Sequence, residues 1–132
     1  MQYPSSLSGA DLVDLATQRY FANVDAKNMD AVLACFHDTA LFTIQTDHTR
    51  HHGKGEIREM FQTFFDSYET IIHKDFVCTV DEKNGRVSAV FNVVLVDADG
   101  NETRMQNTNF WRILDDRFQE VYVYMSGANV LV

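Results

Sequence analysis

The hydrophobic pattern of this chain changes period at about residue 68, and that change constrains the fold more than any other feature. Before it, apolar residues recur at i, i+4, i+7, i+8 and i+11, the spacing of one buried helix face: Ile57, Phe61, Phe64, Phe65 and Tyr68. After it, apolar and polar residues alternate with period two, as in strands with one buried face. Helices followed by a run of strands predict the α+β class.

Turn residues divide the second half of the chain into strands over residues 70–81, 86–97, 102–114 and 118–126. The first break is Asn84-Gly85, the strongest short hairpin signal, and the second is Asp99-Gly100. A charged turn at residues 115–117 precedes the last strand. These turns predict neighbouring antiparallel strands.

The first half of the chain predicts two helices, a strand and a polar loop ahead of the amphipathic helix. Ser8 followed by Asp11 indicates a helix start, and apolar spacing carries that helix over residues 9–25. Asn28 is a candidate N-cap of a short helix, which residues 37–39 end. Residues 40–46 predict a strand and residues 47–52 a loop. Three helices then pack on a curved, mostly antiparallel sheet, and the cone-shaped interior suits a small-molecule site.

Length and composition narrow the class of protein. A chain of 132 residues with 45% hydrophobic residues predicts one domain, spanning residues 1–132, with a well-filled core. The net charge of −8 argues against nucleic acid and anionic membranes as partners. No secretory signal or apolar span is present, so a cytoplasmic protein is expected, with Cys35 and Cys78 as reduced thiols. No cofactor is expected.

The first half also carries a family resemblance. The element order resembles the nuclear transport factor 2-like superfamily, together with Arg19-Tyr20 in the first helix, Asp25 before the short helix, His37-Asp38-Thr39-Ala40 entering the strand, and Gly53. That superfamily includes the ketosteroid isomerases and the SnoaL-like polyketide cyclases. The resemblance implies a cone-shaped, cystatin-like fold over the whole chain, but this fold hosts isomerases, cyclases, dehydratases and non-catalytic binders.

Comparison with ketosteroid isomerase implies roles for particular residues. The family's oxyanion-hole tyrosine falls on Tyr20, and its second oxyanion donor falls near Asn109, whose amide can still donate a hydrogen bond. A second pocket tyrosine falls on Phe61, and the general-base aspartate falls on Ile44, which cannot carry a proton. Part of the set of groups that polarise a carbonyl is thus present, but the residue that moves the proton is missing. Steroid isomerisation by that mechanism is therefore not expected.

A polar cluster, Asp47, His48, His51 and His52, is the remaining candidate for acid–base chemistry. One of these residues, His52 in the first instance, could reach over the cone mouth as a replacement base. A metal site or a solvated loop are the alternatives, and no second cluster supplies a third metal ligand. His37 and His73 are interpreted as structural or surface residues, and Asp25 as a helix cap.

The interior of the cone is expected to bind a small apolar or carbonyl-containing molecule, because the inward positions are rich in Phe and Met. The candidate ligand-binding residues are Ile44, Phe61, Phe65, Met105, Trp111 and Met125, and the candidate catalytic residues are Tyr20, Asn109 and His52.

Two functions remain open. One is an isomerase, cyclase or dehydratase acting on a small carbonyl compound. The other is a non-catalytic binding module or small subunit, for which Ile44 at the base position argues. Tyr122 and Tyr124 face away from the cone, and exposed aromatic residues on a long sheet predict a homodimer through that outer face.

Overall fold

The computed structural model describes residues 5–132 and begins with one long, continuous helix. It comprises α1 (Gly9–Val13), a π-helical segment η1 (Asp14–Arg19) and α2 (Tyr20–Asp25). The Ser8 hydroxyl accepts a hydrogen bond from the Asp11 backbone N–H at 3.2 Å, so the predicted helix start and the span of residues 9–25 are both confirmed. The π-helical segment ends directly before Tyr20, and Tyr20, Phe21 and Val24 are all buried.

Two further helices complete the helical layer. The short α3 (Met29–Leu33) begins at the predicted cap, where the Asn28 side chain accepts from the Ala31 N–H at 3.3 Å. The amphipathic helix α4 (Gly53–Ser67) follows β2 and buries Met60 and the predicted stripe except Tyr68. Tyr68 is the C-cap residue and is half-buried. None of the helices among residues 5–132 is long and apolar enough to cross a membrane.

The strands form one sheet of order β2-β1-β6-β5-β4-β3. Only β1 and β6 are parallel; the other neighbours are antiparallel. The strands are β1 (Phe36–Ile44), β2 (Thr49–His52), β3 (Thr70–Asp81), β4 (Arg86–Val96), β5 (Glu102–Leu114) and β6 (Arg117–Tyr124). The α+β class and the cone-shaped fold are therefore confirmed, and the strands after residue 68 agree with their predicted limits to within two residues.

The structure corrects two predictions in the first half. Strand β1 begins at Phe36, so residues 37–39 lie inside it and do not separate helix from strand. Phe36 is buried, and its backbone pairs with that of Phe118 in β6. Because the strand already begins at Phe36, the polar residues 37–39 lie within it. Residues 49–52, predicted as loop, form the edge strand β2 on β1. Edge strands tolerate charged and polar residues, so their composition resembles that of a loop.

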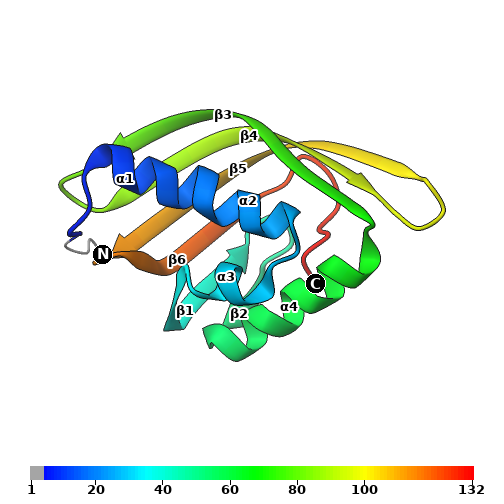
Figure 1. Ribbon diagram of the computed structural model, residues 1–132, viewed down its shortest axis with the longest axis horizontal. Coiled ribbons are helices and arrows are strands. Elements are labelled where there is room, and N and C mark those ends of the chain that lie inside the picture. The colour runs from blue at the N-terminus through cyan, green and yellow to red at the C-terminus, as the bar shows by residue number, and fades with distance from the viewer. Residues whose placement is uncertain (1–4) are drawn as a thin grey trace.

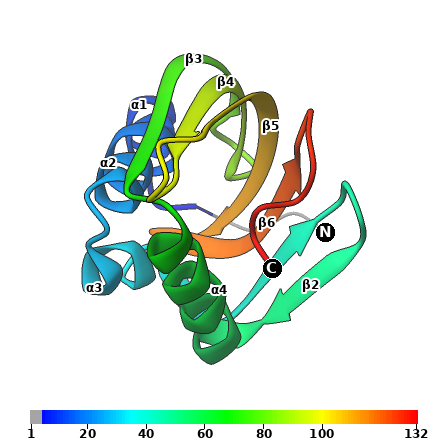
Figure 2. The same cartoon turned by 90° about the vertical axis from the view of Figure 1, so that its right-hand side faces the viewer.

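The sheet curls around a core that the helices close. Figure 1 shows the long N-terminal helix lying across β3, β4 and β5, and Figure 2 shows α4 beside β1 and β2 at the other end of the sheet. Five aromatic rings lie around Tyr20, with centroids 4.7 to 6.4 Å from its ring: Phe21, Phe36, Phe61, Trp111 and Phe118. Tyr20 is therefore the centre of the core, and the cavity described below opens beside it.

Candidate active site

A small cavity lies inside the cone and has a volume of about 30 Å³, room for about one water molecule. Its wall comes from α2, α4, the inner face of the sheet and the segment that follows β6. Most of the lining is apolar, and the polar side chains in it are those of Tyr20, His73, Asn107 and Asn109. A few polar groups converging in an apolar cavity are typical of small-molecule sites.

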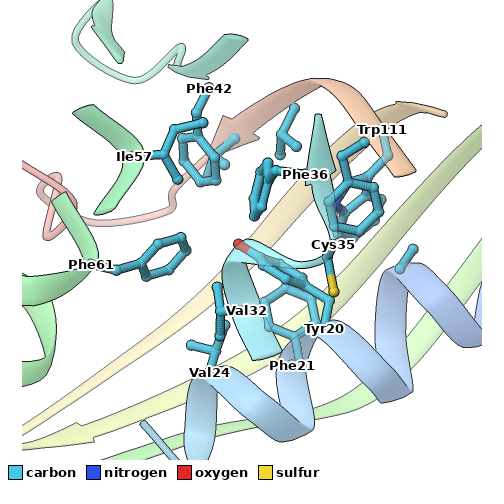
Figure 3. Close-up of a cluster of buried hydrophobic side chains, with 14 of the residues drawn as sticks. Tyr20, Phe21, Val24, Val32, Cys35, Phe36, Phe42, Ile57, Phe61 and Trp111 are labelled. Carbon is cyan, nitrogen blue, oxygen red and sulfur yellow. The ribbon is translucent and has the colours of Figure 1, made fainter. Parts of the chain in front are cut away.

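Tyr20 brings a protonated hydroxyl to this cavity. Its side chain is 2% exposed, and Figure 3 shows its oxygen directed toward the space between Phe36 and Phe61. Burial, followed by the nearby Cys35 and Asp25, raises the pKa of Tyr20 well above 10.0. No hydrogen bond joins this hydroxyl to any residue within 5–132, so the O–H remains free to donate to a ligand.

Asn109 and Asn107 line the cavity from β5. Asn109 is 3% exposed, and its Oδ1 is buried without a hydrogen-bond partner among residues 5–132. The Asn107 Oδ1 is already used, because it accepts from the Ser126 N–H at 3.3 Å. A buried amide oxygen without a partner is destabilising, so a ligand that donates a hydrogen bond to the Asn109 Oδ1 would relieve that penalty.

His73 on β3 lines the cavity and is paired with a carboxylate outside it, that of Asp25 at the end of α2. The His73 Nδ1 lies 2.6 Å from Asp25 Oδ1, and the His73 backbone N–H donates to Asp25 Oδ2 at 2.9 Å. The His73 side chain is 8% exposed and that of Asp25 26%. A carboxylate at this distance fixes the tautomer that carries a proton on Nδ1, and Nε2 then holds the lone pair.

Aromatic packing also fixes the His73 ring. Its imidazole stacks on Phe21 with ring centroids 4.3 Å apart and an angle of 23° between the planes. The Phe21 ring stacks in turn on Phe76 at 5.3 Å. The imidazole is thus oriented by a hydrogen bond in its plane and by a ring on its face, the kind of support that a positioned base needs.

The sequence did not single out this pair. It interpreted Asp25 as a helix cap and His73 as a structural or surface residue. The one available signal was the phase of β3, because His73 follows the buried Ile71 by two positions and so shares its face.

The structure separates the expected ligand-binding residues into two groups. Phe61, Met105 and Met125 line the cavity, whereas Ile44, Phe65 and Trp111 are buried away from it in the core. The Trp111 Nε1–H has no partner among residues 5–132, and its ring meets the Tyr20 ring edge-on at 6.4 Å.

The histidines of the polar cluster lie outside the cavity. His52 is exposed at the start of α4, where its backbone N–H donates to Glu56 Oε1 at 3.0 Å. The His51 Nε2 hydrogen-bonds the Leu131 carbonyl at 3.2 Å. The described part of the chain contains no group of three side chains able to hold a metal ion. The geometry gives no support to His52 as the base and offers His73 in its place.

A second concave surface lies on the opposite, outer face of the sheet. It is a groove of about 390 Å³ that includes Phe110, Arg112, Tyr122 and Tyr124. Phe110 and Tyr124 are 47% and 48% exposed and pack edge to face with centroids 5.8 Å apart. Of the two tyrosines predicted for this outer face, Tyr124 is exposed and Tyr122 is half-buried.

Comparison with known proteins finds one matching family profile and several solved structures of similar fold. The sequence profile of the SnoaL-like domain matches residues 17–121. A candidate polyketide cyclase from Xanthomonas campestris pv. campestris superposes with a TM-score of 0.79 at 22% identity, covering 88% of this chain and 90% of that one.

Two other solved structures show the same likeness. A candidate aromatic ring hydroxylase from Novosphingobium aromaticivorans gives a TM-score of 0.74 at 23% identity, with 92% and 90% coverage. A protein of ketosteroid isomerase-like fold from Catenulispora acidiphila, in complex with trimethylamine, gives 0.77 at 12% identity, with 89% of both chains covered. No curated protein matches the sequence. At these identities the structural likeness shows a shared fold.

Proposed function

This chain belongs to the SnoaL-like family, and we propose that it is an acid–base enzyme that uses the Asp25–His73 pair to move a proton on a small apolar carbonyl compound. The observation that carries the proposal is the 2.6 Å hydrogen bond between Asp25 and the His73 imidazole at the wall of a mostly apolar cavity. Family membership supports a small-molecule site, and the geometry supplies the base that Ile44 cannot be.

The proposed reaction begins with the carbonyl oxygen accepting a hydrogen bond from the Tyr20 hydroxyl. The Asn109 Nδ2 donates a hydrogen bond to the same carbonyl oxygen, or the Asn109 Oδ1 accepts one from a second polar group of the ligand. The His73 Nε2 then removes a proton from the carbon next to the carbonyl, and the C–H electron pair moves into the enolate. Negative charge develops on the oxygen beside Tyr20, where a donor contributes most because water is excluded. Asp25 stabilises the resulting imidazolium through Nδ1.

The imidazolium then returns its proton, and the site of return decides the product. Return to a different carbon gives an isomer, and transfer to a hydroxyl leaving from the β carbon gives an unsaturated ketone and water. Attack of the enolate on a second carbonyl, with the proton passing to the new alkoxide, closes a ring. Each outcome conserves atoms and requires no oxidant.

Exchange of carbon-bound hydrogen in D₂O tests the common first step without knowledge of the natural substrate. A panel of small cyclic and aryl ketones is incubated with the protein, and loss of the α-proton signal is followed by NMR. His73→Phe keeps the stacked ring and removes the base, so exchange should fall to the buffer rate. Tyr20→Phe should slow it by about 100-fold or more, the usual effect of losing one oxyanion donor.

The matched control is His37→Phe. His37 is also a half-buried histidine, and its Nε2 lies 2.7 Å from the Leu114 carbonyl, away from the cavity. This variant should exchange at the wild-type rate. Wild-type exchange in His73→Phe would refute the proposal.

A non-catalytic binding module is the second candidate, and Ile44 at the position of the family's general base favours it. A cavity of about 30 Å³ does not hold a ketone without rearrangement. Binding of panel ketones to the cavity without any exchange above the buffer rate would favour this function.

The outer groove supports a further proposal, a homodimer through the outer face of the sheet. Phe110 and Tyr124 expose about half of their surface there, and large aromatic residues are enriched at interfaces. Sedimentation equilibrium at micromolar concentration should give a dimer for the wild type and a monomer for Phe110→Glu. A monomeric wild type would remove the proposal.

A further inference from the structure

The cavity is closed on one side by the segment that follows β6, residues 126–132, which we call the closing segment. Val130 and Leu131 of this segment line the cavity together with residues of the helices and strands. The segment belongs to no strand or helix. Figure 2 shows it, in red, turning back from the end of β6 toward α4. Together with Met125, it is thus the irregular part of the cavity wall among the described residues.

The start of the closing segment is anchored to the sheet. The Met125 N–H donates to the Thr46 hydroxyl at 2.8 Å, and the Ser126 N–H donates to the Asn107 side chain at 3.3 Å. Ser126 also accepts from the Gln106 N–H at 2.9 Å. A hinge for the segment would therefore lie beyond Ser126, at residues 127 and 128.

The far end is held by a small set of side-chain hydrogen bonds to the polar cluster in β2 and in the turn before it. Asn129 Nδ2 donates to both Asp47 carboxylate oxygens, at 3.1 and 3.3 Å. Asn129 Oδ1 accepts from the Leu131 N–H at 2.7 Å, and the Leu131 carbonyl accepts from His51 Nε2 at 3.2 Å. We call Asp47, His51 and Asn129 the latch.

The size of the cavity requires part of its wall to move before a ligand larger than water can bind. Opening the cone at α2, α4 or the strands would break helix bonds, strand ladders and the packing of the aromatic core. Opening it at the closing segment breaks the latch bonds and withdraws Val130 and Leu131 from the core. The segments of lowest local stability are those that move to admit ligands.

We propose that the closing segment is a gate over the cone and that Asp47, His51 and Asn129 hold it shut. The polar cluster that the sequence singled out then has a role in ligand access, and His51 acts as a hydrogen-bond donor to the gate. The proposal rests on the proposed function in one respect, that the cone is where the ligand binds. It is independent of the Asp25–His73 chemistry.

Stopped-flow uptake of prodan, a naphthyl ketone whose fluorescence shifts to the blue in apolar surroundings, tests the gate. NMR signals of the Met105 and Met125 methyl groups, both in the cavity wall, establish that the probe has reached the cone and not the outer groove. Asn129→Ala removes latch bonds without altering a lining residue. It should speed uptake about fivefold, the factor that corresponds to the net loss of one hydrogen bond. His51→Phe keeps a ring beside Phe42 and should act in the same direction.

The matched control is Asn101→Ala. Asn101 Nδ2 donates to Asp97 Oδ2 at 3.2 Å, so this variant also loses an Asn–Asp pair, but in the turn between β4 and β5. Uptake should equal that of the wild type. Native-state hydrogen exchange gives a second readout, in which Asn129→Ala should accelerate exchange of the Leu131 amide and leave that of Val121 in β6 unchanged.

The outcomes separate this proposal from the proposed function. Wild-type uptake rates in both Asn129→Ala and His51→Phe would overturn the gate, whatever the catalytic activity. His37→Phe should take up prodan at the wild-type rate, since His37 lies neither in the latch nor in the cavity wall. Failure of prodan to reach the cone even in a variant ending at Ser126, folded as judged by its exchange-protected sheet, would overturn both the gate and the cone as ligand site.

Discussion

Breaking the Asp25–His73 hydrogen bond should destabilise the fold by an amount that a double-mutant cycle can isolate. The bond joins residues 48 positions apart and ties the end of the N-terminal helix to β3. Its partners are 26% and 8% exposed, so solvent screens it less than a surface pair. Hydrogen bonds to a charged group contribute about 1.5–3 kcal/mol, which sets an expected coupling of about 2 kcal/mol.

The cycle uses Asp25→Asn, His73→Phe and the double variant. Asparagine keeps an oxygen for the His73 backbone N–H, so that bond at 2.9 Å can persist. Phenylalanine keeps the stacking on Phe21 and removes only Nδ1 from the pair. The cycle therefore reports the side-chain bond with little change to its surroundings. The free energy of unfolding is measured by urea denaturation at neutral pH, and the His73 tautomer by long-range ¹H–¹⁵N NMR.

Two results would contradict this reasoning. A coupling energy below about 0.5 kcal/mol would place the pair among interactions that add nothing measurable. A wild-type His73 with its proton on Nε2 would show that Asp25 does not fix the tautomer, and the proposed base would then have no lone pair facing the ligand.

Three further outcomes follow from particular contacts. Burial raises the pKa of Tyr20, so the folded protein holds the phenol proton more tightly than the unfolded chain. The contribution of the protonated phenol to the free energy of unfolding is complete below about pH 10 and is lost as the pH rises further. Phenolate absorbance should therefore show Tyr20 ionising only when the protein unfolds in alkali. Lys27→Met should cost about 1–2 kcal/mol in urea melts, because Lys27 Nζ donates to two backbone carbonyls at the end of α4. Gly53→Ala should cost about 1 kcal/mol or more in the same assay, since Gly53 has φ +78° and an added Cβ would lie 3.2 Å from the Asp38 carbonyl oxygen.

The sheet was predictable where local turn chemistry and periodicity agreed. Asn84-Gly85 and the alternation around it gave both limits of β3, because a hairpin turn and a period of two depend only on neighbouring residues. The strand β2 was not predictable in this way. Its four residues, Thr-Arg-His-His, are polar, and only pairing with residues 41–44 of β1 makes them a strand.

The site required information that no local pattern contains. Tyr20 and Asn109 could be placed at the cavity by resemblance, and Phe61, Met105 and Met125 by their inward phase. Ile44, Phe65 and Trp111 have the same inward phase but do not border this cavity, because phase does not distinguish a residue that fills the core from one that borders a cavity.

The Asp25–His73 pair was partly predictable from the alternation of inward and outward residues along β3. His73 lies in phase with the buried Ile71, so the alternation of β3 already directed its side chain toward the helical layer. A histidine on that face needs a polar partner, because burying an unpaired imidazole is unfavourable. The helical layer offers few acidic residues near its core-facing stripe, and Asp25, one position after the buried Val24, is among them. Requiring each inward polar side chain to have a partner would therefore have favoured this pair over His52, which the exposed end of β2 leaves in solvent.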